Sequence, residues 1–320
     1  MKVVPYTNSD FEEWDDFLSK CYNATFLHSR RFLSYHGVRF EDASLRILDR
    51  RGRLIGLFPA AVSPTDPKEV ISHPGITYGG IVHGRELRGT NIIECLEQIS
   101  SGYRARGFER LLYKAIPTVY QLSPSEDDLY ALFRVGAERT RCDLSAAIDL
   151  PRWDGAPTRS LRNSLKRARN RGLRVESSIE RLPEFWAILT KKLSKRHSTK
   201  PVHTLIEIQG LSENFPENIQ LVTAILSSEV VAGVLLFHSS QTTHAQYGAC
   251  NAQGAAAGAL DFVIETSIRD AALRKLRYFD FGISNELDGT VLNAGLHRSK
   301  EKFGASGITH EFYSLRLGTR

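Results

Sequence analysis

The chain has 320 residues, of which 42% are hydrophobic and 24% are charged. This is the balance of a folded globular protein, and the length leaves room for two domains. The composition excludes a disordered chain, a collagen-like repeat and a protein dominated by a charged tail. Lysine and arginine outnumber aspartate and glutamate by 42 − 36 = 6, so the location of the basic residues is more informative than their number.

Four cysteines are scattered along the chain without a CxxC pair: Cys21, Cys95, Cys142 and Cys250. This spacing favours neither a zinc site nor a disulfide framework, so we expect reduced cysteines and no metal ion. The longest apolar run, at 230–237, is too short to span a bilayer, and no secretory signal opens the chain. We therefore expect a cytoplasmic protein without a membrane span. Its oligomeric state stays open, with a closed homodimer as the commonest arrangement.

The first half of the chain predicts an α/β domain. A glycine-rich loop is expected at 72–80, between two groups of helices and strands. The expected helices lie at 9–20, 28–36, 90–106 and 125–136, and the expected strands at 44–49, 54–62, 110–115 and 142–150.

The second half repeats this order of elements, although it shows no close repeat of residues. Pro151, Gly155 and Pro157 cluster between the halves, which predicts domains at 1–150 and 151–320. The expected helices of the second domain lie at 158–170, 182–197, 260–275 and 291–303, and its strands at 219–226, 230–237, 243–250, 278–282 and 308–317.

Basic residues are concentrated in one predicted helix and just after it. The segment 155–175 contains no acidic residue and seven basic ones: Arg159, Arg162, Lys166, Arg167, Arg169, Arg171 and Arg174. Thr158 fits the N-cap of this helix, and an apolar stripe would face the core beside a stripe of Arg162, Lys166 and Arg169. The basic stripe is either a solvated face or a phosphate site, to which a diphosphate-bearing substrate or an RNA backbone would be suited.

A strand, a turn of small residues and a long helix follow one another at 243–275. Small side chains let an anion approach the free N–H groups at a helix start, so the turn indicates either a pyrophosphate site or tight packing. Neither GxGxxG nor GxxxxGK[ST] occurs in the chain, which excludes Rossmann and P-loop nucleotide sites.

Three short motifs accompany this order of elements: Tyr247-Gly248-Ala249 on the strand, Asp280-Phe281-Gly282 after the long helix, and 300–304 near the end. Together they resemble the GNAT acyltransferase fold, and the whole chain resembles the FemAB-type arrangement of two GNAT-like domains in tandem. The resemblance implies an α/β (α+β) fold with a mixed, mainly antiparallel sheet in each domain and an acyl-CoA site in the domain at 151–320. Its small-residue turn departs from the usual Q/RxxGxG/A pattern. The resemblance rests on the basic helix and on these three motifs, of which the last is Lys300-Glu301-Lys302-Phe303-Gly304.

The resemblance implies direct acyl transfer in a ternary complex, in which an amine attacks the donor carbonyl without a covalent acyl-enzyme. It assigns charge stabilisation to Lys300 and places His73 at the cleft as a candidate base. His244 is a further candidate, because it alternates with Gln246 on a strand and both could face a cleft. A purely structural role stays open for all three catalytic candidates. Coenzyme A is expected to bind Tyr247, Gly248, Ala249, Gln253, Gly254 and Gly258.

The favoured function is an N-acyltransferase that moves an acetyl or 3-hydroxybutyryl group from coenzyme A to the amine of a dTDP- or UDP-linked amino sugar, for O-antigen or capsule synthesis. The expected acceptor-binding residues are Tyr78, Arg162, Lys166, Arg169, Asn285 and Glu286, with the last two binding sugar hydroxyls. Two alternatives remain: a FemAB-type peptidyltransferase that extends a cell-wall precursor from aminoacyl-tRNA, and a non-catalytic binding module on a degenerate GNAT scaffold. DNA is not an expected partner, because the positive charge is confined to one helix.

Overall fold

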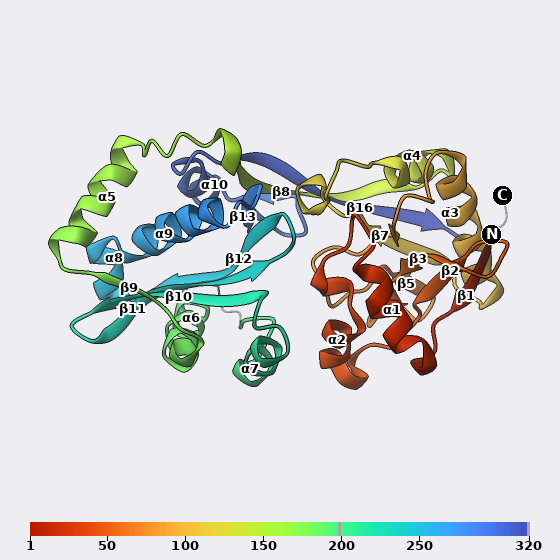
Figure 1. Cartoon of the computed structure of the whole chain (residues 1–320), viewed down its shortest axis with the longest axis horizontal. Coiled ribbons are helices and arrows are strands. Elements are labelled where there is room, and N and C mark those ends of the chain that lie inside the picture. The colour runs from red at the N-terminus through yellow and green to blue at the C-terminus, as the bar shows by residue number, and fades with distance from the viewer. Residues whose placement is uncertain (198–199, 319–320) are drawn as a thin grey trace. The chain divides into compact units, whose positions relative to one another are not determined.

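The computed structural model describes residues 1–197 and 200–318, which form two compact units (Figure 1). The first unit contains Met1–Leu144, Asn285–Val291 and the chain from Thr309 onward, and the second contains Ser145–Ser284 and Leu292–Ile308. The sequence predicted one boundary between 150 and 151. The structure places the change of unit within a strand and returns the C-terminal segment to the first unit, because the last strand pairs with a strand of that unit.

The first unit combines helices with two sheets. One sheet has the strand order β1-β2-β3-β6, and the strands β4-β5-β7-β16-β8 are neighbours in the other. The helices are α1 (Phe11–Leu18), α2 (Arg30–Leu33), α3 (Thr90–Ala105) and α4 (Asp127–Arg134). The strands are β1 (Lys2–Pro5), β2 (Leu45–Leu48), β3 (Leu54–Phe58), β4 (Ala61–Val62), β5 (Glu69–Ile71), β6 (Val82–His83), β7 (Arg110–Lys114), β8 (Glu138–Asp149) and β16 (Ser306–Arg316).

The core of the first unit is built largely on α3. The side chains of Ile92, Leu96, Ile99 and Tyr103 recur on one face of this helix and are buried. They belong to one apolar cluster with strand residues such as Leu111 of β7. This cluster holds the sheets and helices of the unit together.

The second unit has one sheet, in which neighbours follow the order β8-β13-β12-β11-β10-β9. All its pairs are antiparallel except β12 with β13. The strands are β9 (Arg174–Ser177), β10 (Ile219–Leu226), β11 (Glu229–His238), β12 (Thr242–Cys250) and β13 (Tyr278–Ile283). The helices are α5 (Arg159–Asn170), α6 (Leu182–His197), α7 (Leu205–Asn214), α8 (Ala252–Ala257), α9 (Ala259–Leu273) and α10 (Ala294–Glu301). Between β13 and α10 in the chain, two further short strands, β14 (Asn285–Glu286) and β15 (Val291–Leu292), pair with each other.

Helices cover both faces of this sheet (Figure 1). Phe185 of α6 packs against Gly233 of β11 on one face. The next residue of β11, Val234, points to the opposite face and lies in the apolar cluster that contains Val263 of α9. A β-strand buried on both faces is expected to be apolar, as β11 is from Val230 to Phe237.

Most predicted elements are present within a few residues, and the mixed α/β architecture with mainly antiparallel sheets is confirmed. The basic helix is α5, and the hydroxyl of Thr158 accepts a hydrogen bond from the Leu161 N–H at 3.4 Å, as expected of an N-cap. Leu161, Leu165 and Ala168 are buried, which confirms the predicted apolar face.

The predicted turn of small residues between the strand and the long helix is wrong for most of its length, which is helical. Ala252–Ala257 form α8, whose N-cap Asn251 accepts a hydrogen bond from the Gly254 N–H at 2.8 Å. Alanine has the highest intrinsic helix propensity, and this segment is rich in alanine. The helix is interrupted only at Gly258, where φ is 77° and α9 begins.

Close packing explains the two glycines of this segment. A Cβ on Gly254 would lie 2.3 Å from the Val231 carbonyl oxygen of β11, and a Cβ on Gly258 would lie 2.7 Å from the Ser164 carbonyl oxygen of α5. The sequence predicted that these glycines let a phosphate approach the backbone. In the structure they let β11 and α5 approach it instead.

Substitution of Gly258 tests this packing. We expect Gly258→Ala to lower the free energy of unfolding by about 3 kcal/mol, because the positive φ costs about 1–2 kcal/mol and the contact with Ser164 adds a similar amount. The measurement is urea denaturation followed by circular dichroism.

Gly172 provides a matched control, because it has a φ of 71° and its added Cβ would meet nothing within 4 Å. Gly172→Ala should lower the free energy of unfolding only by the cost of the positive φ, about 1–2 kcal/mol. Equal losses in the two variants would show that α5 does not pack closely on the turn.

Candidate active site

The parallel pairing of β12 and β13 ends in the middle of β12. The paired residues are Thr242 with Tyr278, Thr243 with Phe279, and His244 with Asp280. Beyond His244, β12 continues to Cys250 while pairing with β11 on its other side. The two parallel strands therefore part from each other immediately after His244 and Asp280.

A β-bulge accompanies this parting. Leu236 of β11 pairs with Ala245, whereas the neighbouring Leu235 pairs with Tyr247, so Gln246 is an extra residue in β12. An extra residue bends its strand and increases the local twist. The bulge thus changes the course of β12 just beyond its last pairing with β13.

A buried carboxylate lies where the strands part. Asp280 is fully buried, and its Oδ2 lies 2.6 Å from Nδ1 of His244. Its Oδ1 accepts hydrogen bonds from the Ser145 hydroxyl at 2.6 Å and from the Gly282 N–H at 3.1 Å. Ser145 is also fully buried, so the hydrogen bonds that hold this carboxylate are shielded from water.

This arrangement fixes the chemistry of His244. Because a carboxylate only accepts hydrogen bonds, Nδ1 of His244 is the protonated nitrogen of the neutral ring and Nε2 carries the lone pair. The side chain of His244 is 14% exposed, in contrast to its buried partner. A histidine oriented by a buried carboxylate in this way can accept a proton at Nε2 and has its positive charge stabilised when it does so.

Lys300 of α10 lies beside the same stretch of β13. Its Nζ donates to the carbonyl oxygens of Gly282 at 2.6 Å and Ile283 at 2.8 Å, and to the hydroxyl of Ser284 at 2.8 Å. Burial lowers the pKa of Lys300 to about 8, although the charge of Asp280 acts in the opposite direction. The structure thus brings His244 and Lys300, two of the three predicted catalytic residues, to the end of β13.

The predicted donor-binding segment of β12 lies beyond the parting. The ring of Tyr247 packs edge-on against Trp186 of α6, and its hydroxyl lies 2.8 Å from Nδ1 of His203. Gly248 is exposed, and its carbonyl oxygen accepts a hydrogen bond from Nζ of Lys192 at 3.3 Å. Ala249 is buried opposite Gly233.

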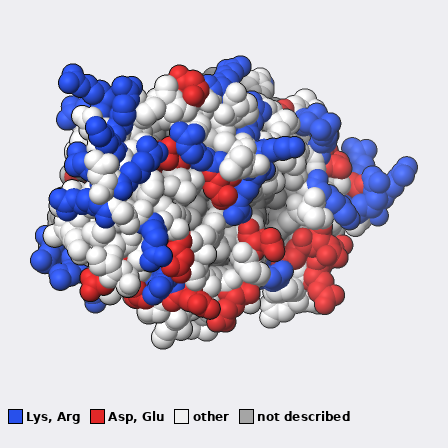
Figure 2. Space-filling view, turned by 60° about the vertical axis from the view of Figure 1, so that its left-hand side comes forward, with Lys and Arg blue, Asp and Glu red and all other residues white. Residues whose placement is uncertain are grey.

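The basic stripe of α5 is exposed. Arg162, Lys166 and Arg169 all point away from the core, and Arg162 donates to the Pro157 carbonyl oxygen at 3.3 Å. Lys and Arg side chains gather in the upper left part of Figure 2, on the side where Figure 1 shows α5. Gln253 of α8 is exposed as well, whereas Gly254 and Gly258 are buried by the packing described above.

His73 is not at a cleft, contrary to the prediction. It is 6% exposed, its ring lies 5.1 Å from that of His36, and burial holds its pKa well below the usual range. Its carbonyl oxygen accepts a hydrogen bond from the buried Nζ of Lys114 at 3.2 Å. Lys114 also donates to the Ile76 carbonyl oxygen, so His73 helps to anchor the loop at 72–80.

Tyr78 is also part of this buried loop. It is 3% exposed, its ring packs 4.4 Å from that of Tyr120, and its hydroxyl donates to Thr25 Oγ1 at 3.3 Å. The loop continues the pairing of β7 past the end of β5, because the Gly79 N–H donates to the Lys114 carbonyl oxygen at 3.0 Å. The predicted role of Tyr78 in binding the acceptor is therefore not supported, since the side chain is enclosed by its own unit.

Asn285 and Glu286 belong to the first unit, in strand β14. The amide of Asn285 is used within the chain, where it donates to the Gly289 carbonyl oxygen at 3.1 Å and accepts from the Leu144 N–H at 2.5 Å. Asn285 therefore shapes a turn, which contradicts its predicted role in binding sugar hydroxyls. Glu286 is exposed.

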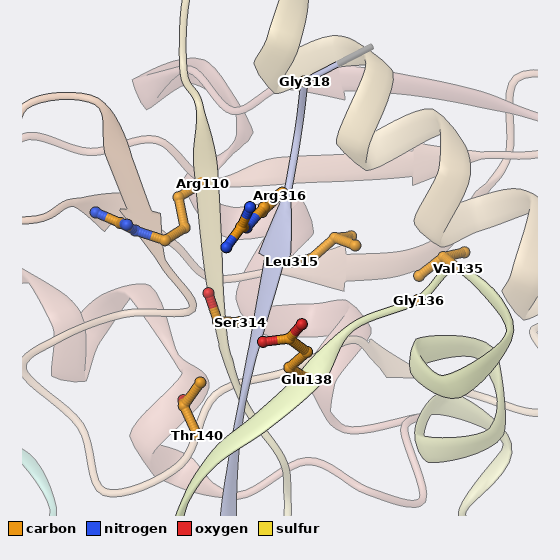
Figure 3. Close-up of a pocket in the computed structure, with 9 residues that line it drawn as sticks. All are labelled: Arg110, Val135, Gly136, Glu138, Thr140, Ser314, Leu315, Arg316 and Gly318. Carbon is orange, nitrogen blue, oxygen red and sulfur yellow. The ribbon is translucent and has the colours of Figure 1, made fainter. Parts of the chain in front are cut away.

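A cavity of about 390 Å³ lies in the first unit and contains none of the predicted site residues (Figure 3). Arg110 and Arg316 come from the neighbouring strands β7 and β16. Arg110 is paired with Asp66 at 2.5 Å and Glu69 at 2.8 Å, which neutralises it. The cavity is lined by Arg110, Val135, Gly136, Glu138, Thr140, Ser314, Leu315, Arg316 and Gly318.

Sequence reasoning missed the contribution of Asp280 and Ser145. Asp280 appears in the sequence only as part of a short aromatic-glycine strand, and Ser145 is an ordinary residue of another strand. Their relation to His244 depends on which strands are neighbours and in which register, and no local pattern carries this information.

The described residues contain no helix with the length and apolar character needed to cross a membrane. They also contain no group of three or more His, Cys, Asp or Glu side chains placed to hold a metal ion.

Comparison with known proteins finds a family similarity within the second half of the chain. The acetyltransferase (GNAT) domain family matches residues 158–288, almost all of which lie in the second unit. No curated protein sequence matches the chain.

Solved structures share the fold over nearly the whole chain. FemX has a TM-score of 0.70 at 14% identity, and the match covers 98% of this chain and 97% of FemX. L-PGS from Bacillus licheniformis has a TM-score of 0.63 at 12% identity, covering 94% and 90%. A tandem GNAT protein from the clavulanic acid biosynthesis pathway has a TM-score of 0.56 at 10% identity, covering 100% and 99%. These similarities show a tandem GNAT-like fold, and at such identities they show the fold alone.

Lys114 provides a test of the buried loop in the first unit. Burial lowers the pKa of Lys114 to about 7, so above pH 7 the folded chain has lost a proton that the unfolded chain keeps up to about pH 10.5. The contribution of Lys114 to the free energy of unfolding therefore increases as the pH rises from about 7 to about 10.5. Between pH 7 and 9.5 the wild type should gain about 2–3 kcal/mol in free energy of unfolding relative to Lys114→Met.

Urea denaturation at both pH values measures this difference. Lys20→Met, at an exposed position, serves as the control and should follow the wild type at both values. Parallel behaviour of the wild type and Lys114→Met would mean that Lys114 is not enclosed by the loop.

Proposed function

We propose that the protein is an N-acyltransferase in which His244, oriented by Asp280, removes the proton from an attacking amine. The observation that carries this proposal is the 2.6 Å contact between His244 Nδ1 and Asp280 Oδ2 at the point where β12 and β13 part. A GNAT acetyltransferase domain over residues 158–288 supports acyl transfer as the reaction class.

The proposed reaction is direct transfer. The amine nitrogen forms a bond to the carbonyl carbon of the donor thioester, and Nε2 of His244 accepts the amine proton. The C–S bond then breaks, and the leaving thiolate takes a proton from the imidazolium, which regenerates His244 and gives an amide and a free thiol. Asp280 stays ionised throughout and stabilises the transient imidazolium.

We propose acyl-coenzyme A as the donor, with its pantetheine arm along Tyr247, Gly248 and Ala249. This part of β12 lies beyond the ladder with β13, and Gly248 is exposed there. Backbone N–H groups in this segment would meet the oxyanion that develops on the donor carbonyl. Gly254 and Gly258 have no part in this proposal, because packing accounts for both.

We propose a nucleotide-linked amino sugar as the acceptor, with its diphosphate on the basic stripe of α5. Arg162, Lys166 and Arg169 lie on successive turns of one exposed helix face. Guanidinium and ammonium groups bind phosphate through charge-assisted hydrogen bonds. The like charges also repel one another along the helix, and a bound diphosphate would relieve this repulsion.

A FemAB-type peptidyltransferase is the second candidate. The seven basic residues in the segment 155–175 would also be suited to the phosphates of a charged tRNA. The two candidates share the same chemistry at the amine and differ in the carrier of the acyl group.

The first experiment is a thiol-release assay with acetyl-CoA and 3-hydroxybutyryl-CoA, each with and without dTDP- and UDP-linked amino sugars. We expect release that depends on the sugar. Asp280→Asn should lower kcat by about 10²–10⁴-fold, because His244 would lose the anion that orients it and stabilises its charge. Absence of release with every pair, together with transfer from aminoacyl-tRNA, would favour the peptidyltransferase.

The acceptor site is tested by charge reversal on α5. Replacing Arg162, Lys166 and Arg169 together by glutamate should raise the KM for the sugar nucleotide by about tenfold or more and leave kcat nearly unchanged. The matched control reverses three exposed arginines of the first unit: Arg50, Arg51 and Arg104. An equal rise in KM in both triple variants would show that the effect depends on the net charge of the protein and not on the basic stripe of α5.

A further inference from the structure

Lys300 uses all of its hydrogen-bond donors within the protein. An ammonium group has three N–H bonds, and Nζ of Lys300 has three acceptors within 2.8 Å: the carbonyl oxygens of Gly282 and Ile283 and the hydroxyl of Ser284. The residue is 5% exposed. A lysine that bound the reacting carbonyl would have to give up one of these hydrogen bonds.

The three acceptors belong to consecutive residues at the end of β13. This stretch is bent, because Gly282 has a φ of 75°, and Ser284 is fully buried. The bend disrupts the ladder of β13 with β8, whose register shifts between Asp280 and Ile283. Carbonyl groups turned away from a ladder need other partners, and Lys300 supplies them.

The bent stretch contacts both members of the proposed catalytic pair. The Gly282 N–H donates to Oδ1 of Asp280 at 3.1 Å. A Cβ on Gly282 would lie 3.3 Å from Cε1 of His244, so the backbone there is in close contact with the imidazole ring. A shift of Gly282 would therefore move the carboxylate and the ring together.

We propose that Lys300 is a positioning residue, which holds the bend at Gly282 and through it keeps the Asp280 carboxylate aimed at Nδ1 of His244. The proposal deepens the proposed function and rests on it for the role of His244 as the base. It differs from the role that the family resemblance implies for Lys300, which is stabilisation of charge on the reacting groups.

The charge of Lys300 supports the same positioning role as its hydrogen bonds. The titratable side chains brought together at this end of β13 are Asp280 on the strand itself, His244 on β12 and Lys300 on α10. The positive charge of Lys300 favours the ionised form of Asp280, which is the form that holds the proton on Nδ1 of His244. Replacement of Lys300 by methionine removes both the hydrogen bonds and this charge.

The experiment compares Lys300→Met, Ser284→Ala and a control, Lys302→Met. Lys302 lies just after α10 and pairs with Asp261 at 2.7 Å, away from the three acceptors. We expect Lys300→Met to lower kcat by about 10²-fold with little change in the KM of either substrate. Ser284→Ala removes one acceptor and keeps the lysine, so kcat should fall by about 2- to 10-fold. Lys302→Met should match the wild type.

A second measurement does not depend on activity. ¹⁵N NMR of the imidazole rings reports the tautomer of His244 in the protein without substrates, with His244→Gln used to assign its signals. We expect the Nδ1–H tautomer to dominate in the wild type and to lose population to the Nε2–H tautomer in Lys300→Met. We expect a smaller shift toward the Nε2–H tautomer in Ser284→Ala. This variant tests the proposal even if Lys300→Met fails to fold.

The outcomes separate the two proposals. Loss of kcat in Lys300→Met with the tautomer of His244 unchanged would overturn the positioning role and assign Lys300 to the reacting groups. Full activity in Ser284→Ala with an unchanged tautomer would also overturn it. If the wild type transfers no acyl group, the proposed function fails, and a tautomer change in the variants would still support the link from Lys300 to His244.

Discussion

The parting of β12 from β13 after His244 and Asp280 is the constraint on which the candidate site depends. While the two strands remain paired, their backbone groups are used by the ladder and most of their side chains are buried. The bulge at Gln246 redirects β12 away from β13. His244 and Asp280, the last residues that pair, therefore lie where these two strands separate. A buried carboxylate and a partly exposed imidazole can then meet at 2.6 Å, which combines a strong orienting bond with access for a substrate.

The two units use a buried lysine in the same way and with different results. Lys114 ends β7 and donates to carbonyl oxygens of the loop at 72–80, and Lys300 donates to carbonyl oxygens at the end of β13. In the first unit the loop folds over the lysine and pairs with the end of β7, and His73 is buried there. In the second unit the carbonyls belong to the strand itself, and the imidazole of His244 keeps some exposure.

Two parts of the second unit differ in their electrostatic environment. The cluster around Asp280 is buried and nearly balanced, with one carboxylate, one lysine and a histidine. The stripe on α5 is exposed and positive, and its apolar side is fixed in the core by Leu161 and Leu165. A buried environment strengthens the hydrogen bonds that orient a proton acceptor. An exposed positive surface is suited to binding a hydrated phosphate. The tandem GNAT-like fold contains both environments, and a fold by itself does not specify a substrate.

The sequence by itself determined the elements whose signals are local. The periodicity of α5, its N-cap at Thr158 and the alternation of helices and strands could be predicted, because each depends on residues within a few positions of one another. The same reasoning failed at 251–259, where small residues fit both a phosphate loop and a packed helix, and only the contacts of Gly258 with α5 distinguish the two. It identified His244 as a candidate but not its partner Asp280, which lies 36 residues further along the chain. Only the tertiary structure decided that pair, because strand order and register arise from the packing of the whole sheet.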